Sequence, residues 1–197
     1  MSVRLTPFLG PKEIAALVAR LGEEISVQHP DGVVLVGFLK DSAIFLADLA
    51  RSVRIECEVD FISLSAYQPG ASRVRVMKDL DLDVSGRDVI LVRDILDTGL
   101  SVRYVLGLLD ARGARSVKLC ALLDRRERHI LPLEADYLGT EVDQRFLVGY
   151  GLDLGERYRN LPGLVRVDPA ALEADPEVAI AAMYGEGRAF ADTPSWG

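Results

Sequence analysis

The stretch that most constrains this chain is residues 89–101, where an apolar segment runs through two aspartates into a turn of threonine, glycine and serine. Residues 89–92 are continuously β-branched or aliphatic, which is typical of a strand covered on both faces in a parallel sheet. Asp94 and Asp97 then fall at the carboxyl end of that strand, the edge at which open α/β sheets bind ligands. We therefore expect an α/β protein with a site at this edge.

The turn that follows this strand has the composition of a phosphate site. Apolar residues recur at helical spacing from Val102 onward, so a helix is expected to begin near Gly99. Its free N–H groups, with the Thr98 and Ser101 hydroxyls, can hold a phosphate at the positive end of the helix dipole. Gly99 lets the backbone approach the anion closely. For Asp-Thr-Gly taken alone, the alternative is an ordinary strand-to-helix turn with an N-cap.

Strands and helices alternate along the rest of the chain. Strands are expected over residues 32–38, 54–65, 89–92, 117–123, 146–150 and 164–167, and helices over 11–22, 43–51 and the segment after residue 99. This alternation favours a largely parallel sheet with right-handed crossovers. Residues 66–75 contain Pro69 and Gly70, which indicates a loop. Residues 168–197 are expected to form a partly helical extension, with a helix over 176–184.

Composition excludes several classes of protein. With 197 residues and 49% hydrophobic content, the chain can bury a sizeable core. A net charge of −7 leaves no basic stripe to replace the counterions of a nucleic acid. No apolar run approaches the roughly 18 residues of a membrane span, and the N-terminus has no basic segment ahead of a hydrophobic core. We therefore expect a cytoplasmic protein that binds neither nucleic acid nor membrane, with reduced, buried cysteines and surface histidines.

Five separated motifs match one family in order and spacing. They are Phe38–Lys40 ahead of Phe45–Leu49, Val59–Phe61 ahead of Ser65–Tyr67, the 89–101 stretch, Leu122–Asp124, and Phe146–Asp153 followed by Tyr158–Pro162. Through them, residues 33–167 resemble the purine phosphoribosyltransferases of the hypoxanthine-guanine type. The resemblance implies an α/β type I phosphoribosyltransferase fold, in which helices flank a central, mostly parallel twisted sheet. It implies a domain over residues 1–167, with a small hood from its N- and C-terminal parts.

The same resemblance implies an enzyme of the pentosyltransferase class that serves purine salvage. It would transfer a 5-phosphoribosyl group from phosphoribosyl pyrophosphate to a purine base such as hypoxanthine or guanine, and release pyrophosphate. Mg²⁺ is the implied cofactor, and a homodimer or homotetramer is the implied assembly. Two alternatives stay open, which are a divergent transferase with altered base specificity and a nucleotide-binding regulatory protein with little transferase activity.

Individual residues receive roles from this resemblance. Asp97 would accept the purine N7 proton, which requires a carboxylate within hydrogen-bonding reach. The ribose and 5′-phosphate would lie against Asp94, Thr98, Gly99, Leu100 and Ser101, the pyrophosphate against Lys40, Asp41 and Arg159, and the base against Arg125, Phe146 and Leu147. Asp153 and Asp94 would hold Mg²⁺, a hard cation that takes oxygen ligands. Tyr67 would lie on a loop that closes over the site.

Four positions depart from the family pattern. Arg93 stands where the pattern has the first acid of an acidic pair, and Asp41 follows Lys40 where the pattern has glycine. Arg125 takes the place of a lysine, and Ala66 that of a serine. An aspartate that faces pyrophosphate adds like-charge repulsion. Because Arg93 and Asp41 have opposite charges, we expect their side chains to lie close enough for a salt bridge.

Overall fold

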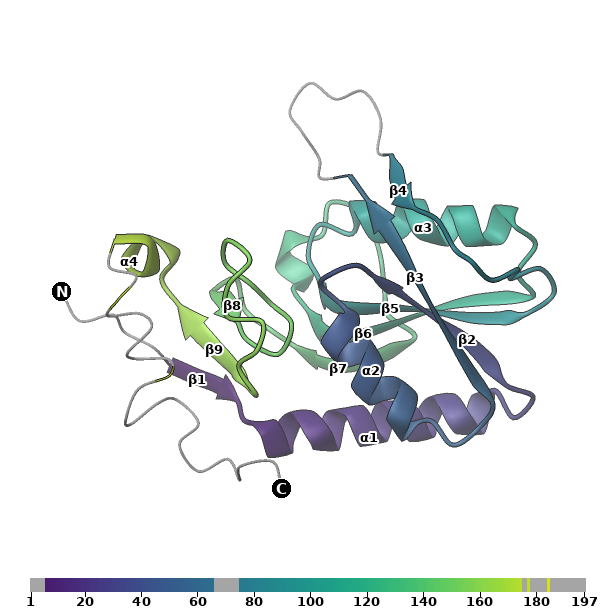
Figure 1. The fold of residues 1–197 in the computed structure, drawn as a ribbon, viewed down its shortest axis with the longest axis horizontal. Helices are drawn as coiled ribbons and strands as arrows, with labels where there is room; N and C mark the ends of the chain where they lie inside the picture. The colour runs from purple at the N-terminus through teal and green to yellow at the C-terminus, as the bar shows by residue number, and fades with distance from the viewer. Residues whose placement is uncertain (1–5, 66–74, 175–176, 178–183, 185–197) are drawn as a thin grey trace. The chain divides into compact units, whose positions relative to one another are not determined.

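The computed structural model describes residues 6–65, 75–174, 177 and 184. The chain divides into two compact units (Figure 1), a larger unit of Leu17–Asp143 and a smaller unit in which Met1–Ala16 joins Gln144–Gly197. Helix α1 (Pro11–Gln28) begins in the smaller unit and continues into the larger one. Within the described part of the chain, no helix is both long enough and apolar enough to cross a membrane.

A six-stranded sheet forms the larger unit, with the order β4-β3-β2-β5-β6-β7. The strands are β2 (Val33–Phe38), β3 (Cys57–Leu64), β4 (Val76–Lys78), β5 (Asp88–Leu96), β6 (Ser116–Asp124) and β7 (Tyr137–Glu141). Every neighbouring pair is parallel except β3 and β4. The predicted largely parallel α/β sheet is therefore confirmed, and the parallel strands bring their carboxyl ends to one edge.

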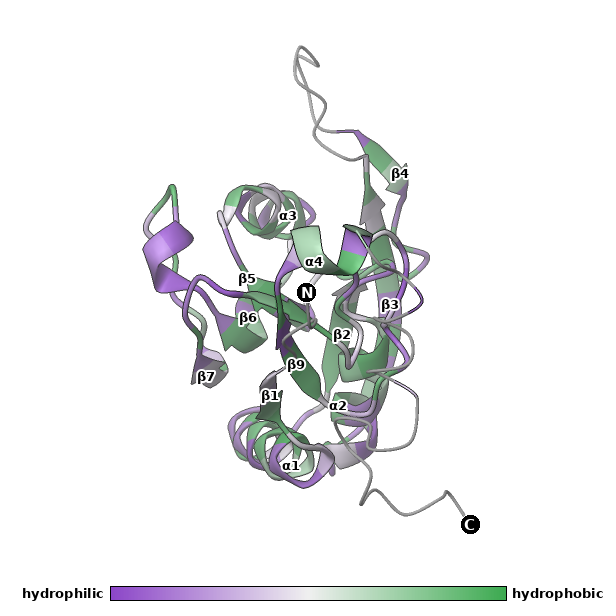
Figure 2. Cartoon of the chain, turned by 90° about the vertical axis from the view of Figure 1, so that its left-hand side faces the viewer, coloured by the Kyte–Doolittle hydropathy of each residue, from purple (hydrophilic) through white to green (hydrophobic). Residues whose placement is uncertain are grey.

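Helices cover both faces of this sheet. Figures 1 and 2 show α3 (Leu100–Ala111) on one face, and α1 with α2 (Ala43–Ser52) on the other. Val34 and Val36 of β2 share a buried cluster with Val105 and Leu109 of α3. Because strand side chains alternate between faces, the fully buried Leu35 belongs to the opposite side. The hydrophobic colouring of β2, β5 and β6 in Figure 2 marks this core.

Helix α1 extends six residues beyond its predicted end, because Gly22 is not a helix stop. A Cβ atom at Gly22 would lie 2.1 Å from the Oγ atom of Ser52, at the end of α2. The glycine therefore allows α1 and α2 to approach each other closely. The helix continues past it with Ile25, which is fully buried.

The smaller unit contains a three-stranded antiparallel sheet with the order β1-β9-β8. Its strands are β1 (Thr6–Leu9), β8 (Phe146–Val148) and β9 (Leu164–Val167), and the short helix α4 (Pro169–Ala174) follows. Val148, Tyr158 and Val165 form part of its own buried cluster. The strand predicted over 164–167 is confirmed, whereas β1 was not predicted. Most of the helix predicted over 176–184 and the loop predicted over 66–75 lie outside the described residues.

The prediction of surface histidines is wrong. His29 is 5% exposed, and its ring nitrogens lie 3.0 Å from the Tyr137 hydroxyl and 3.3 Å from Asp88 Oδ2. His129 is also mostly buried, with Nε2 2.7 Å from Asp124 Oδ1. The His29 ring is sheltered because polar groups distant in sequence satisfy its nitrogens, whereas His129 lies against an acid only five residues before it. Both cysteines are free thiols, as predicted, and Cys120 is buried, but Cys57 is only partly so.

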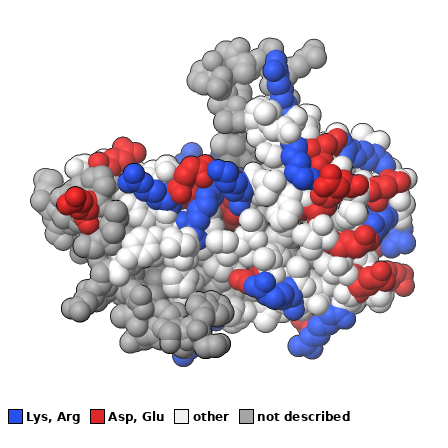
Figure 3. All heavy atoms as spheres, in the orientation of Figure 1, with Lys and Arg blue, Asp and Glu red and all other residues white. Residues whose placement is uncertain are grey.

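The surface carries mixed charge. On the face drawn in Figure 3, the Lys and Arg side chains of the described residues are interspersed with Asp and Glu side chains. They form no continuous basic stripe on that face. A nucleic-acid backbone needs such an array of cations to replace its counterions.

Candidate active site

The turn between β5 and α3 ends at the N-terminus of a helix. Gly99 is the N-cap of α3 and has a φ of 80°, a left-handed conformation that glycine adopts without steric cost. The Gly99 carbonyl accepts a hydrogen bond from Arg103 N at 2.9 Å, so the helix is regular from its first turn. The N–H groups before Arg103 have no helical acceptor, and they coincide with the positive end of the helix dipole. The predicted helix start near Gly99 is thus confirmed.

The segment after β6 holds this turn from one side. Arg125 N donates to Leu96 O at 2.9 Å, and Ile130 N donates to Thr98 O at 3.1 Å. Between these two bonds, Arg128 Nε lies 2.7 Å from Asp97 Oδ1. Asp97 therefore sits on a turn fixed at both ends, with its carboxylate partly open to solvent.

Arg125 is a buried cation beside Asp97. Arg125 directly follows the last residue of β6, and it is only 7% exposed. Burial lowers the pKa of the Arg125 guanidinium, and the Asp97 carboxylate acts in the opposite direction. A buried guanidinium gives a directional set of N–H donors at this edge of the sheet.

Asp94 is a deeply buried acid of this region. It lies inside β5, is 2% exposed, and neither of its carboxylate oxygens accepts a hydrogen bond of normal geometry among the described residues. Burial raises its pKa, Arg93 opposes that rise, and Asp41 adds to it. A carboxylate at this edge of the sheet has the acceptor oxygens that hydroxyl groups of a ligand need.

The predicted salt bridge between Arg93 and Asp41 is confirmed, with Nη1 and Oδ2 3.5 Å apart. Arg93 Nε also lies 3.5 Å from Asp94 Oδ1. Its guanidinium carbon stands 4.6 Å above the centre of the Phe38 ring. The peptide bond between Leu39 and Lys40, just before Asp41, is cis.

A second set of predicted residues lies in the smaller unit. Phe146 and Leu147 belong to β8, where Leu147 is buried and Phe146 only partly so. After β8 the chain turns sharply at Gly149, where φ is 101° and a Cβ would lie 2.1 Å from Gly163 O. This turn leads to Asp153, whose Oδ2 accepts a hydrogen bond from Glu156 N at 2.8 Å.

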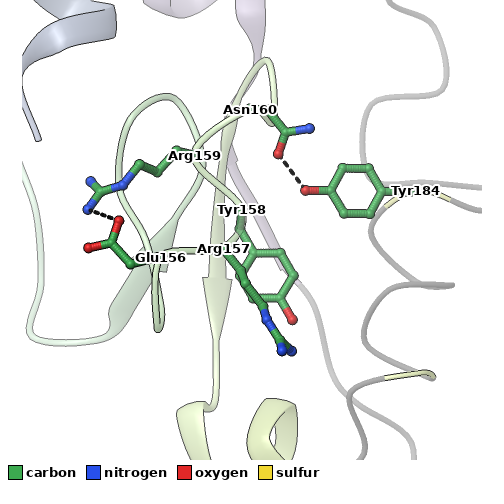
Figure 4. Close-up of a pocket in the computed structure, with 6 residues that line it drawn as sticks. All are labelled: Glu156, Arg157, Tyr158, Arg159, Asn160 and Tyr184. Atoms are coloured by element: carbon green, nitrogen blue, oxygen red, sulfur yellow. Dashed lines mark hydrogen bonds and ion pairs between the residues drawn. The ribbon is translucent and has the colours of Figure 1, made fainter. Parts of the chain in front are cut away.

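Arg159 is held by the loop that carries Asp153. Its Nη1 donates to Gly151 O at 2.7 Å, and its Nη2 lies 3.0 Å from Asp153 Oδ1 and 3.5 Å from Glu156 Oε2. Figure 4 shows Arg159 turned toward Glu156. The guanidinium is thus oriented by two acids and one carbonyl.

The same loop lines a cavity of about 440 Å³ (Figure 4). Its lining consists of Glu156, Arg157, Tyr158, Arg159, Asn160 and Tyr184. The Tyr184 hydroxyl donates to Asn160 Oδ1 at 2.7 Å. Of the residues predicted to bind substrate, only Arg159 contributes to this cavity.

A family model for the phosphoribosyl transferase domain matches residues 10–154. The chain belongs to the phosphoribosyltransferase family. The match contains every predicted site residue except Arg159, which lies just beyond its end.

The alignments between this chain and its relatives extend over nearly the whole length of each relative. Hypoxanthine phosphoribosyltransferase of Escherichia coli strain K12 is 40% identical over 161 residues, which span 79% of this chain and 90% of that protein. Hypoxanthine-guanine phosphoribosyltransferase of Bacillus subtilis strain 168 is 38% identical over 170 residues, 84% of this chain and 94% of that protein. A solved hypoxanthine-guanine phosphoribosyltransferase from Bacillus anthracis aligns with a TM-score of 0.80 and 32% identity, over 84% and 99% of the two chains. The expected type I phosphoribosyltransferase fold is therefore confirmed.

The predicted site residues of this phosphoribosyltransferase fall into two groups. Within the larger unit, the edge formed by the ends of β2, β5 and β6 carries Lys40, Asp41, Asp94, Asp97, Thr98, Gly99, Leu100, Ser101 and Arg125. Within the smaller unit, β8 and its following loop carry Phe146, Leu147, Asp153 and Arg159. Tyr67 lies outside the described residues.

Arg128 was missed as a residue of this edge. The charged run 125–128 has the pattern of a solvated turn, and Arg126, Glu127 and Arg128 are indeed exposed. The sequence did contain a signal for Arg128: the charged run comes directly after a predicted parallel strand, and a segment in that position starts at the edge of the sheet where ligands bind. In the structure, Arg128 forms an ion pair with the Asp97 carboxylate.

Two acids of the predicted site are suited to bind a metal ion that also has substrate oxygens as ligands. No group of three or more histidine, cysteine or acidic side chains with metal-binding geometry occurs among the described residues. Mg²⁺ is commonly bound by one or two carboxylates together with substrate phosphates. Asp94, with oxygens that accept no normal hydrogen bond, and Asp153, on its own loop, each fit that donor set.

Proposed function

We propose that this chain is a hypoxanthine-guanine-type phosphoribosyltransferase of purine salvage. It transfers the 5-phosphoribosyl group of phosphoribosyl pyrophosphate to a purine base, forming a nucleotide and pyrophosphate. The observation that carries the proposal is the 40% identity to the hypoxanthine phosphoribosyltransferase of E. coli, which extends over 90% of that protein. A likeness of that extent spans 79% of this chain.

The larger unit supplies the groups for phosphoribosyl binding and proton transfer. The N–H groups from Thr98 to Ser101 would bind the 5′-phosphate at the start of α3. The Asp94 carboxylate, which accepts no hydrogen bond of normal geometry among the described residues, would accept the ribose hydroxyls. As the purine N9 forms its bond to C1′ and pyrophosphate departs, Asp97 would accept the proton from N7. The buried Arg125 would donate to the exocyclic oxygen of the base.

The smaller unit supplies the groups for the base and the leaving group. Phe146 would stack on the purine face, where an aromatic ring adds apolar area and a favourable quadrupole. Arg159, oriented by Asp153 and Glu156, would bind pyrophosphate as a planar donor. Asp153 of this unit, and Asp94 of the larger unit, are each proposed as a carboxylate ligand for Mg²⁺, which would supply positive charge for the departing pyrophosphate.

The test is a panel of nucleobases with phosphoribosyl pyrophosphate and Mg²⁺, read by chromatography of the nucleotides formed. We expect product with hypoxanthine, guanine or both, and no product after chelation of the metal with EDTA. Xanthine, adenine, orotate and uracil complete the panel. Product only with a base other than hypoxanthine or guanine would support a divergent base specificity. No product with any base, together with tight nucleotide binding, would replace the proposal with the regulatory alternative.

Three further features stay predictions. We infer that residues 1–167 form the catalytic domain, with a hood from its N- and C-terminal parts, and that 168–197 extend it. A homodimer or homotetramer is expected, which light scattering of the purified protein would measure. A cytoplasmic location is expected as well, and fractionation of the source cells would test it.

A further inference from the structure

Arg93 occupies an unusual place for a cation, near the carboxyl end of a central strand. Its side chain is only 19% exposed. The flat guanidinium lies over the Phe38 ring, and its Nε atom donates to Ile95 O at 3.3 Å. Guanidinium groups stack on aromatic faces in this way while their edges stay available for carboxylates. Arg93 is thus held in one orientation by its own surroundings.

Two acids from different segments flank this guanidinium. Asp41 belongs to the turn between β2 and α2, and Asp94 belongs to β5. Both are 3.5 Å from Arg93, one at Nη1 and the other at Nε. The arginine therefore connects the turn after β2 to the end of β5 through its side chain.

The turn that Arg93 holds also carries Lys40. Its backbone is closed by bonds from Ser42 N to Phe38 O at 3.0 Å and from Ala43 N to Lys40 O at 3.2 Å. These bonds close the turn on itself, and none of them joins it to β5. The bond between Asp41 and Arg93 makes that connection, and it acts next to the segment that presents Lys40.

Charge makes the two residues dependent on each other. Without Arg93, Asp41 would repel the buried Asp94, and both would face a ligand that carries several negative charges. Without Asp41, a cation at position 93 would keep its contact with Asp94 but lose its ion pair with the turn. A cation at 93 and an acid at 41 therefore form a matched pair.

We propose that Arg93 is a positioning residue for phosphoribosyl pyrophosphate, and that with Asp41 it fixes the turn bearing Lys40 against the end of β5. The proposal rests on the proposed function. In this role Arg93 acts through the turn, because its guanidinium contacts two carboxylates and the Phe38 ring. Its effect should thus fall on the affinity for phosphoribosyl pyrophosphate and leave the affinity for the base unchanged.

The test is a double-mutant cycle of Arg93→Gln, Asp41→Asn and the combined variant. We expect Arg93→Gln to raise the KM for phosphoribosyl pyrophosphate about tenfold, because it leaves two neighbouring acids uncompensated. The KM for the base should stay within about twofold. The combined variant should be no worse than Arg93→Gln, because coupled residues are not additive. Effects that simply multiply in the combined variant would overturn the proposal, as would equal changes in both KM values.

Arg112→Gln is the matched control. Arg112 pairs with Asp79 at 2.7 Å in the same unit, away from the β5 edge, and is similarly sheltered. Its loss should leave both KM values unchanged. The melting temperature of each variant separates a folding defect from a positioning defect.

Calorimetric titration with phosphoribosyl pyrophosphate and Mg²⁺ separates this proposal from the proposed function. The unaltered protein could bind phosphoribosyl pyrophosphate but make no nucleotide. In that case, the double-mutant cycle is calculated from the dissociation constants for phosphoribosyl pyrophosphate in place of its KM values. Coupling of Arg93 and Asp41 would then support the positioning role, although the transfer reaction would be refuted. If the unaltered protein neither binds nor turns over phosphoribosyl pyrophosphate, both proposals fail.

Discussion

The Nε atom of Arg128 lies 2.7 Å from Oδ1 of Asp97, so the carboxylate proposed as the base is already paired with a cation. The Arg128 and Asp97 side chains are 47% and 36% exposed. Ion pairs with this exposure typically contribute only about 0.2–1 kcal/mol. A purine that approaches Asp97 therefore displaces Arg128 at little cost.

Replacement of Asp97 by asparagine tests the proposed base. We expect kcat to fall by about 10²–10⁴-fold, the usual contribution of a positioned acid or base, since an amide cannot accept the N7 proton. Steady-state kinetics with hypoxanthine or guanine measures the effect. Asp110→Asn, at an exposed position of α3, is the control and should keep full activity. A loss of less than about tenfold in Asp97→Asn would remove Asp97 from the proton transfer.

Replacement of Arg128 by methionine tests whether the ion pair is readily displaced. Since the pair is exposed, we expect kcat/KM for the base to change by less than about fivefold. The same kinetic assay applies, with Arg103→Met as a control on an exposed cation of α3. A loss as deep as that of Asp97→Asn would instead make Arg128 part of the chemistry.

Replacement by alanine should have opposite effects on stability at two glycines, one at the N-cap of α3 and one within the helix. Gly99→Ala places a side chain at a φ of 80° and a Cβ 3.3 Å from Leu133 Cδ2, so it should cost about 1–2 kcal/mol and raise the KM for phosphoribosyl pyrophosphate. Gly107→Ala has no heavy atom within 4 Å and should stabilise the helix by about 0.5–1 kcal/mol with unchanged kinetics. Urea unfolding and kinetics of both variants provide the test. Equal stability changes would show that the N-cap turn is not strained by a side chain.

The stability supplied by Asp88 should depend on pH. Hydrogen bonds from Arg115, Ser116 and His29, the first being the strongest, hold the pKa of Asp88 well below the usual range of an aspartate. A lowered folded-state pKa stabilises the protein above the unfolded-state value of about 3.9, and that stabilisation is lost as the pH falls further. We expect Asp88→Asn to lower the unfolding free energy by about 1–3 kcal/mol at pH 7.

The measurement for Asp88→Asn is urea unfolding at pH 7, 5 and 3. The difference from the unaltered protein should be constant between pH 7 and 5 and should shrink toward pH 3. A difference that is the same at all three values would assign the effect to packing rather than to charge.

Sequence reasoning succeeded where local pattern and fold act together. The apolar run before Asp94, the left-handed turn at Gly99 and the helix after it are each dictated by neighbouring residues. The pair of Arg93 and Asp41 was predictable for another reason. Both positions depart from one family pattern, and their opposite charges fall on adjacent strand ends.

The failures arise from contacts between segments far apart in the chain. Nothing near His29 in sequence shows that Tyr137 and Asp88 satisfy its ring, so a lone histidine has the pattern of a surface residue. Gly22 has the pattern of a helix stop because its true reason, the approach of Ser52, comes from another helix. Strand β1 has only four residues, including a proline, and its partner β9 lies near the opposite end of the chain.

The pairing of β1 with β9 has a consequence for biosynthesis. The ribosome releases Thr6–Leu9 first, but the strand that completes their hydrogen bonding, Leu164–Val167, emerges only after the whole six-stranded sheet has been translated. The larger sheet can therefore assemble cotranslationally, whereas the small sheet must wait until β9 has been translated. In a nascent chain arrested before β9, the strand β1 would lack its partner, and such an unpaired strand is where premature association would begin.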